Sequence, residues 1–173
     1  EGMVYAKPIV PPTRYGSSVK SVDDSQAKNV KGYQQTLVLD DPSDTVPGWA
    51  LVIADSFHAA QRAERLIKVE WNAGPTANVS EQDILNRGSE LIEGSSGSLV
   101  VEDGEVDATF ASANSVFTQS YTTSTVLHFQ LEPVNAIGLQ KEGIWELHTG
   151  NQWQSLILPT LAQSLGVPVE QVV

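Results

Sequence analysis

The sequence predicts an α+β fold in two parts. Short apolar segments with a period of two predict strands, and apolar stripes at helical spacing predict helices. A strand–helix–strand pattern over residues 49–71 predicts a mixed sheet in the first part. The run GSSGS at 94–98 has the composition of a flexible linker. We therefore predict one domain over residues 1–94, a linker over 95–104 and a second domain over 105–173.

Length and composition indicate a globular chain with a real core. The chain has 173 residues, of which 40% are hydrophobic and 18% charged. No apolar run approaches the roughly 18 residues of a membrane span, and no signal peptide is predicted within this sequence. The absence of cysteine excludes disulfides, a thiolate nucleophile and cysteine ligation of zinc or iron–sulfur clusters. It leaves the compartment open.

The net charge of −11 is concentrated in the second half of the chain. Residues 72–173 hold twelve Asp and Glu but only Arg87 and Lys141 as basic residues. A solvated acidic surface is the simplest interpretation of this asymmetry. Since an acidic half repels phosphate backbones, nucleic acid is not expected as a partner.

The first part begins with strands predicted over 3–9, 18–22 and 33–39. Asp23, Asp24 or Ser25 can cap a short helix that ends near Val30. A continuous apolar run at 49–54 predicts a strand that is buried on both faces.

A helix follows, capped by Asp55 or Ser56. The period then changes to two at Ile67 and predicts a strand over 67–71. A short crossover between two strands favours parallel pairing with a right-handed connection.

The second part has fewer periodic segments. Ser80 and Asp83 predict the capped start of a helix through Glu93, and a helical turn is expected over 105–111. A strand is predicted over 115–123, although its alternation is partly broken. Apolar runs at 134–139 and 144–147 flank Lys141, Glu142 and Gly143, which predicts a β-hairpin.

The carboxyl-terminal segment carries an apolar stripe at helical spacing, formed by Trp153, Leu156, Ile157, Leu161 and Leu165. Pro159 lies inside this stripe, so the helix is expected to start near Leu158 or to kink. Gly166 and Pro168 end it. Residues 169–173 have the pattern of a strand without a continuation, which predicts a truncated chain.

The most polar cluster lies between the hairpin and this helix, at residues 148–152 (HTGNQ). Strand-to-helix corners expose backbone groups and short side chains on a rigid support. His128, His148 and Glu132 are chemically suitable metal ligands, but their spacing fits no compact ligand pattern, so we predict no metal site. No GxSxG, GxGxxG or GxxxxGK motif is present.

Three groups of motifs together resemble the molybdenum hydroxylase family, which includes xanthine dehydrogenase and aldehyde oxidase. The similar branch is the molybdopterin-binding large subunit of bacterial isoquinoline 1-oxidoreductase and membrane-bound aldehyde dehydrogenase. The motifs are VKSVDDS at 19–25 with KGY at 31–33; VIADS at 52–56 with IKVEW at 67–71; and HFQLEP at 128–133, TGNQ at 149–152 and LGVP at 165–168. The first two groups resemble the family's α/β hammerhead domain. The third resembles the beginning of its molybdopterin-binding domain.

The resemblance implies a cofactor site at Gly150, Asn151 and Gln152. Gln152 aligns with the glutamine whose side-chain amide donates to an oxo ligand of molybdenum, a role that suits a neutral donor. The alternative is a polar residue at a helix start that bonds a free backbone group. Glu132 either orders the nearby corner or, with Pro133 after it, belongs to a structural turn.

By the same resemblance, the complete enzyme hydroxylates an aldehyde or an N-heteroaromatic compound and takes the oxygen from water. Its cofactor is molybdopterin with molybdenum, in the cytosine dinucleotide form. Its partners are an iron–sulfur small subunit and a cytochrome c subunit, and its location is the periplasm or cell envelope. The family's glycine-rich loop and general-base carboxylate are absent from this sequence, so we expect no catalytic residue here and an inactive isolated chain. A non-catalytic assembly or binding module is the alternative.

Overall fold

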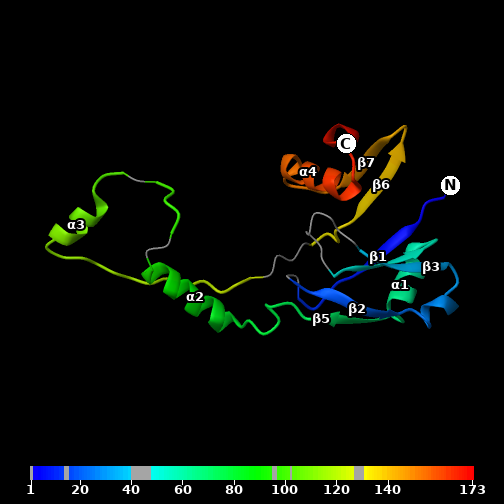
Figure 1. The fold of residues 1–173 in the computed structure, drawn as a ribbon, viewed down its shortest axis with the longest axis horizontal. Helices are drawn as coiled ribbons and strands as arrows, with labels where there is room; N and C mark the ends of the chain where they lie inside the picture. Colours follow the sequence, from blue (N-terminus) through cyan, green and yellow to red (C-terminus); the bar gives the residue numbers. More distant parts are fainter. Residues whose placement is uncertain (1, 14–15, 40–47, 95–96, 102, 127–130) are drawn as a thin grey trace. The chain divides into compact units, whose positions relative to one another are not determined.

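The computed structural model describes residues 2–13, 16–39, 48–94, 97–101, 103–126 and 131–173 (Figure 1). It is a mixed α+β structure, as predicted from the sequence. The chain divides into two compact units, one formed by Glu1–Asn78 with Gln130–Val173 and the other by Val79–Phe129. None of the helices in the described ranges has the length and apolar character that crossing a bilayer requires.

Two small antiparallel sheets form in residues 1–78 (Figure 1). In the first, β4 (Ala50–Ala54) lies between β1 (Tyr5–Ile9) and β3 (Tyr33–Val38). In the second, β2 (Ser18–Asp23) pairs with β5 (Lys68–Asn72). The central position of β4 agrees with its continuous apolar sequence, since a strand paired on both edges is the most enclosed.

The predicted parallel pairing within residues 49–71 is wrong. The order strand–helix–strand is present as β4, α1 (Phe57–Glu64) and β5. However, β1 and β3 occupy both edges of β4, so no edge is left for β5, which pairs with β2 in the other sheet. Edge occupancy depends on strands distant in sequence, and a local pattern does not reveal it.

The helix α1 closes the hydrophobic core of this part. Ser56 is its N-cap and accepts a hydrogen bond from the Ala59 backbone N–H at 3.3 Å. The buried face of α1 consists of small residues, so the helix backbone can approach the sheet closely. The buried core is formed by Ala27, Val30, Val52, Ala54, Ala59, Ala60, Ala63 and Ile67.

The short helix predicted after residue 23 is a single 3₁₀ turn, η1 (Ala27–Asn29). Asp23 accepts a hydrogen bond from the Ser25 backbone N–H at 3.0 Å, which starts the turn. Gly32 then adopts φ 91°, and its carbonyl accepts the Asp55 N–H at 2.9 Å. This positive φ favours glycine, and a Cβ at Gly32 would also displace the Asp55 carboxyl group.

The unit Val79–Phe129 contains α2 (Glu81–Glu93) and α3 (Val106–Ser112). The predicted capping box is complete, because Ser80 accepts the Asp83 N–H and Asp83 accepts the Ser80 N–H. Neither helix buries a residue. The strand predicted over 115–123 is wrong for this structure, since residues 113–126 form no helix or strand.

The predicted hairpin is confirmed as β6 (Ala136–Lys141) and β7 (Ile144–Thr149). Glu142 and Gly143 connect the strands with φ 52° and 85°, the geometry of a two-residue type I′ turn. The helix α4 (Gln154–Leu165) follows and contains Pro159, so it does not start near Leu158. Gly166 ends α4 in the left-handed conformation, and the 3₁₀ turn η2 (Val169–Gln171) follows.

The last two residues return to the hairpin. Val172 forms a parallel bridge with Trp145, the Leu147 N–H donates to the Val173 carbonyl at 2.7 Å, and the Val173 N–H donates to the Trp145 carbonyl at 2.8 Å. Strand β7, helix α4 and the residues after η2 therefore have the order of a β–α–β unit, with residues 150–153 at the carboxyl end of β7.

Candidate functional site

The candidate site is the corner at residues 150–153, between β7 and α4. Thr149, the last residue of β7, donates from its hydroxyl to the Asn135 carbonyl at 2.8 Å, which ties the corner to the residue before β6. Ligands of open α/β sheets bind beyond the carboxyl ends of the strands, where helices begin. At this corner a helix likewise begins just after a strand, although β7 belongs to a two-stranded antiparallel sheet.

Asn151 fixes the backbone of the corner. Its side-chain Oδ1 accepts a hydrogen bond from the Trp153 backbone N–H at 2.6 Å, which forms a turn of the Asx type. This bond occupies the carbonyl oxygen of the Asn151 amide and leaves its NH₂ group free of any partner in the described chain.

Gln152 is exposed, and its side chain makes no hydrogen bond with the described residues. The expected alternative, a bond from Gln152 to a free backbone group, is not observed. Further hydrogen-bond donors lie beside Gln152, at the start of α4. No side chain caps α4, and the backbone N–H groups of Gln154 and Ser155 have no acceptor among the described residues.

The corner and the helix after it are electrically neutral. The sequence has no Asp, Glu, Lys or Arg from Thr149 to Val169, although residues 72–173 hold twelve acidic side chains. A cluster of N–H donors without a nearby carboxylate can receive an oxygen-rich or anionic group without like-charge repulsion. The donor set and its charge thus fit a molybdopterin cofactor.

The sequence pattern assigns Trp153 to the apolar stripe of the helix. In the structure Trp153 instead precedes the first turn of α4 and is 65% exposed. A Trp between a polar cluster and a helix start is the signal that would have placed it at the corner. Gly150 also has open space around it, with no atom within 4 Å of an added Cβ.

The other candidate residues do not join the corner. His128 lies outside the described residues. Glu132 is exposed and has no hydrogen bond or ion pair within the described chain, and His148 Nε2 lies 3.8 Å from Glu146 Oε2. Among the residues that the structure describes, no group of three His, Asp or Glu side chains is arranged to hold a metal ion.

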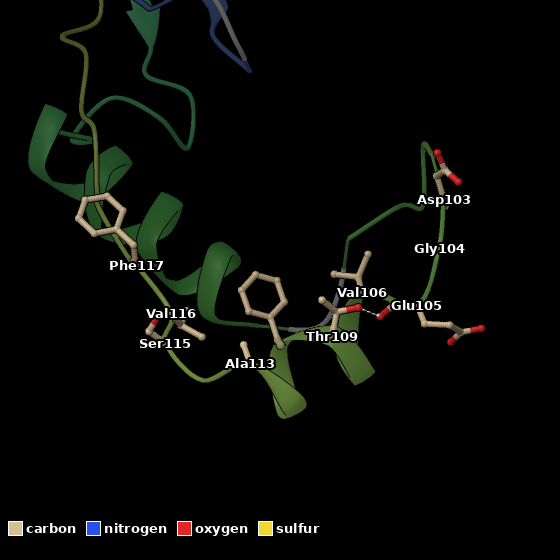
Figure 2. A pocket seen from close by; sticks show the side chains of 10 residues that line it. Asp103, Gly104, Glu105, Val106, Thr109, Ala113, Ser115, Val116 and Phe117 are labelled. Carbon is tan, nitrogen blue, oxygen red and sulfur yellow. Dashed lines mark hydrogen bonds between the residues drawn. The ribbon is translucent and has the colours of Figure 1, made fainter.

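An apolar hollow of about 400 Å³ lies elsewhere, in the unit Val79–Phe129. Figure 2 shows that α3 and the chain just after it form this hollow, and that Asp103 and Glu105 lie on the chain that leads into α3. It includes no residue of the corner. The hollow is therefore a feature separate from the candidate cofactor site.

Comparison with known proteins identifies several similar proteins. The model of the molybdopterin cofactor-binding domain matches residues 91–173. The whole chain is 54% identical to the membrane-bound aldehyde dehydrogenase (pyrroloquinoline-quinone) of Gluconacetobacter polyoxogenes, of which it covers 22%. These matches support a fragment of the molybdenum hydroxylase family. The family resemblance noted in the sequence is thereby confirmed.

Two further comparisons extend the similarity. Rat (Rattus norvegicus) xanthine dehydrogenase/oxidase is 28% identical over 95% of this chain and 14% of its own length. The crystal structure of quinoline 2-oxidoreductase from Pseudomonas putida 86 matches 99% of this chain and 26% of its own chain, with a TM-score of 0.62 and 18% identity. The structural match supports the α+β fold. The chain spans about a fifth of the length of these curated relatives, or less.

Proposed function

We propose that this chain is a region of the large subunit of a molybdenum-dependent oxidoreductase. The complete enzyme hydroxylates an aldehyde or an N-heteroaromatic compound and takes the oxygen from water. Residues 1–94 form an α/β hammerhead domain that acts as a scaffold, and residues 105–173 begin the molybdopterin-binding domain. The observation that carries this proposal is the neutral, donor-rich corner at residues 150–155, which lies inside the segment matched by the cofactor-binding family model.

Each residue of the corner has a separate task. Gln152 would donate a hydrogen bond from its exposed amide to an oxygen of the metal centre, since no residue of the described chain occupies that amide. Asn151 holds the backbone through its bond to Trp153 and presents its own NH₂ group. Gly150 lets the cofactor approach the backbone closely. When bound, the cofactor supplies the redox and oxygen-transfer chemistry.

The proposed cofactor is molybdopterin, in its cytosine dinucleotide form, with one molybdenum. The name of the Gluconacetobacter relative includes pyrroloquinoline quinone. Elemental analysis distinguishes the two cofactors, because the molybdopterin cofactor brings molybdenum and pyrroloquinoline quinone does not. The proposed partners are an iron–sulfur small subunit and a cytochrome c subunit, which carry the electrons away.

The decisive experiment replaces Gln152 by Ala in the full-length enzyme. Residues that orient a metal centre through one hydrogen bond are worth about 10–100-fold in affinity or activity, so turnover should fall by about that factor. The molybdenum content should stay at one per subunit. Gln154→Ala is the matched control, because Gln154 has the same side chain, is also exposed and lies one residue beyond Trp153.

Equal turnover of the Gln152→Ala enzyme and the native enzyme would remove the proposed role of Gln152. A quinone without molybdenum in the purified native enzyme would overturn the cofactor assignment. The 173-residue chain alone is expected to purify without molybdenum and without activity, since the glycine-rich loop and the general base are not in its sequence.

A further inference from the structure

Residues 113–126 are a stretch of chain whose backbone is unpaired. They follow α3 and form no helix or strand. From Asn114 to Val126 no backbone group takes part in a backbone hydrogen bond. The one bond within the stretch joins the Gln119 side chain to the Ser120 carbonyl at 3.5 Å. Thirteen consecutive residues without a backbone partner among the described residues offer a row of nearly free donors and acceptors.

The side chains of this stretch have the composition of a strand. Val, Phe, Thr and Tyr, the residues that favour strands, make up most of residues 116–126. With a period of two, Phe117 and Tyr121 fall on one face, while Thr118, Ser120 and Thr122 fall on the other. Phe117 and Tyr121 are 87% and 88% exposed, although each would bury a large apolar area in a sheet. The free backbone and the exposed aromatic face thus point to the same missing neighbour.

We propose that residues 115–125 form a β-strand on the edge of a sheet supplied by the rest of the full-length polypeptide, with Phe117 and Tyr121 facing its core. This inference rests on the proposed function, in which the chain is a region of a longer subunit. It assigns to the residues after α3 a docking role that is separate from the cofactor corner.

Charge opposes three other occupants, which are a second copy of this unit, an anionic lipid surface and nucleic acid. Residues 79–129 carry eight Asp and Glu but only Arg87 as a basic residue, so two copies of this unit repel each other. The same acidic charge opposes anionic lipid surfaces and nucleic acid. The Gluconacetobacter relative, by contrast, aligns with the whole of this chain over only 22% of its own length. Most of such a subunit is therefore available to provide the sheet edge, and a strand added within one polypeptide pairs at a high effective concentration.

Hydrogen exchange measured by mass spectrometry tests the proposal. In the 173-residue chain, the backbone amides of residues 115–125 should exchange at the rate of an unstructured peptide. In the full-length enzyme the same amides should exchange more slowly by a factor of roughly 100 or more, as in a stable sheet. Rapid exchange of these amides in a full-length enzyme that contains molybdenum would overturn the strand while leaving the cofactor proposal intact. Slow exchange of these amides in a full-length enzyme that contains no molybdenum would overturn the cofactor proposal while leaving the strand intact.

Two variants separate a strand from general apolar burial. Phe117→Asp in the full-length enzyme should abolish the slow exchange of residues 115–125. Phe110→Asp is the matched control, because Phe110 is also exposed but lies on α3. It should leave that exchange slow. Equal loss of protection in both variants would contradict the proposal. Exchange in the native 173-residue chain that becomes slower as its concentration rises would also contradict the proposal. It would identify a second copy as the occupant.

Discussion

Glu142 has a strained backbone conformation at the turn between β6 and β7. Among the described non-glycine residues, it is the one with a positive φ, at 52°. The type I′ turn requires this conformation, and asparagine adopts it more readily than glutamate. We expect Glu142→Asn to raise the free energy of unfolding of the hairpin by about 0.5 kcal/mol. Urea denaturation followed by the fluorescence of Trp145, which lies in β7 beside the turn, measures the change.

The neighbouring residue provides the control. Gly143 has φ 85° and open space around it, so Gly143→Ala adds strain without a collision. It should lower the stability by about 1 kcal/mol. A Glu142→Asn variant that is less stable than the native chain would show that the Glu142 side chain makes a contribution that the turn geometry does not explain.

Asp24 is held in its charged form by its neighbours. The Tyr33 hydroxyl donates to Asp24 Oδ2 at 2.7 Å, and Lys28 Nζ lies 3.0 Å from Asp24 Oδ1. The hydrogen bond from Tyr33 and then that from Lys28 lower the pKa of Asp24 below its ordinary value of 3.8. The stabilisation from this carboxylate is thus fully present above pH 3.8 and is lost as the pH falls through the lower pKa of the folded state.

Removal of the Tyr33 hydroxyl should therefore raise the pKa of Asp24. We expect Tyr33→Phe to move it upward, and an NMR titration of the Asp24 carboxyl carbon measures the change. Thr36→Val is the control, since it removes the other partner of the Tyr33 hydroxyl, at 2.8 Å, and leaves the bond to Asp24 in place. An Asp24 pKa that is the same in Tyr33→Phe and in the native chain would assign the lowering to Lys28 instead.

The helix α2 depends on its amino-terminal cap because it has no buried face. Ser80 and Asp83 exchange hydrogen bonds there, and the bond from the Ser80 hydroxyl lowers the pKa of Asp83. We expect Ser80→Ala to destabilise α2 by about 1 kcal/mol, which is about a fivefold faster exchange of its amides. Hydrogen exchange of the peptides covering residues 84–93 measures it. Gln82→Ala, inside the same first turn, leaves both cap bonds in place and removes only the side-chain bond from Gln82 to Asn86, so its effect on the exchange should be smaller.

Sequence reasoning succeeds for elements whose causes are local. Ser56 and Ser80 each precede a helix, and their hydroxyls act within three residues, so both caps could be predicted. The pairing of β4 could not, because it depends on which strands reach its two edges. Residues 115–123 show the intermediate case. Their local pattern predicts a strand, but a strand needs a neighbour, and the described part of the chain does not pair them.

The candidate site follows the same division. The order Gly150, Asn151, Gln152 is visible in the sequence, and the family resemblance gave it a meaning. The bond between Asn151 Oδ1 and the Trp153 N–H could not be foreseen, because it requires the backbone to turn at this point. Trp153 was misassigned for the related reason that an apolar stripe does not reveal where a helix begins.

The stability of the molecule is distributed unevenly along the chain. Every residue of the buried core cluster lies between Ala27 and Ile67. In the second half of the described chain, by contrast, the buried hydrophobic residues are Ala162 and Val172. Since buried apolar area is the main source of folding free energy, residues 1–78 should hold most of the stability.

We therefore expect a chain of residues 1–78 to fold on its own. Its urea unfolding should be cooperative, because the core is complete within it. The midpoint should lie close to that of the same residues in the 173-residue chain. Trp71 reports on this transition, since its Nε1 donates to the Gly48 carbonyl at 2.8 Å. Residues 130–173 alone should remain unfolded, as they lack a buried cluster.

Matched substitutions in residues 1–78 test the cause of this stability. Val52 is fully buried, so Val52→Ala should cost about 2 kcal/mol through lost burial and the cavity left behind. Val38 is exposed on an edge strand, so Val38→Ala should cost less than about 0.5 kcal/mol. If residues 1–78 alone showed no cooperative transition, their core would need residues from the second half. The two parts of the chain would then fold as one, and the location of the buried side chains would not predict where the stability lies.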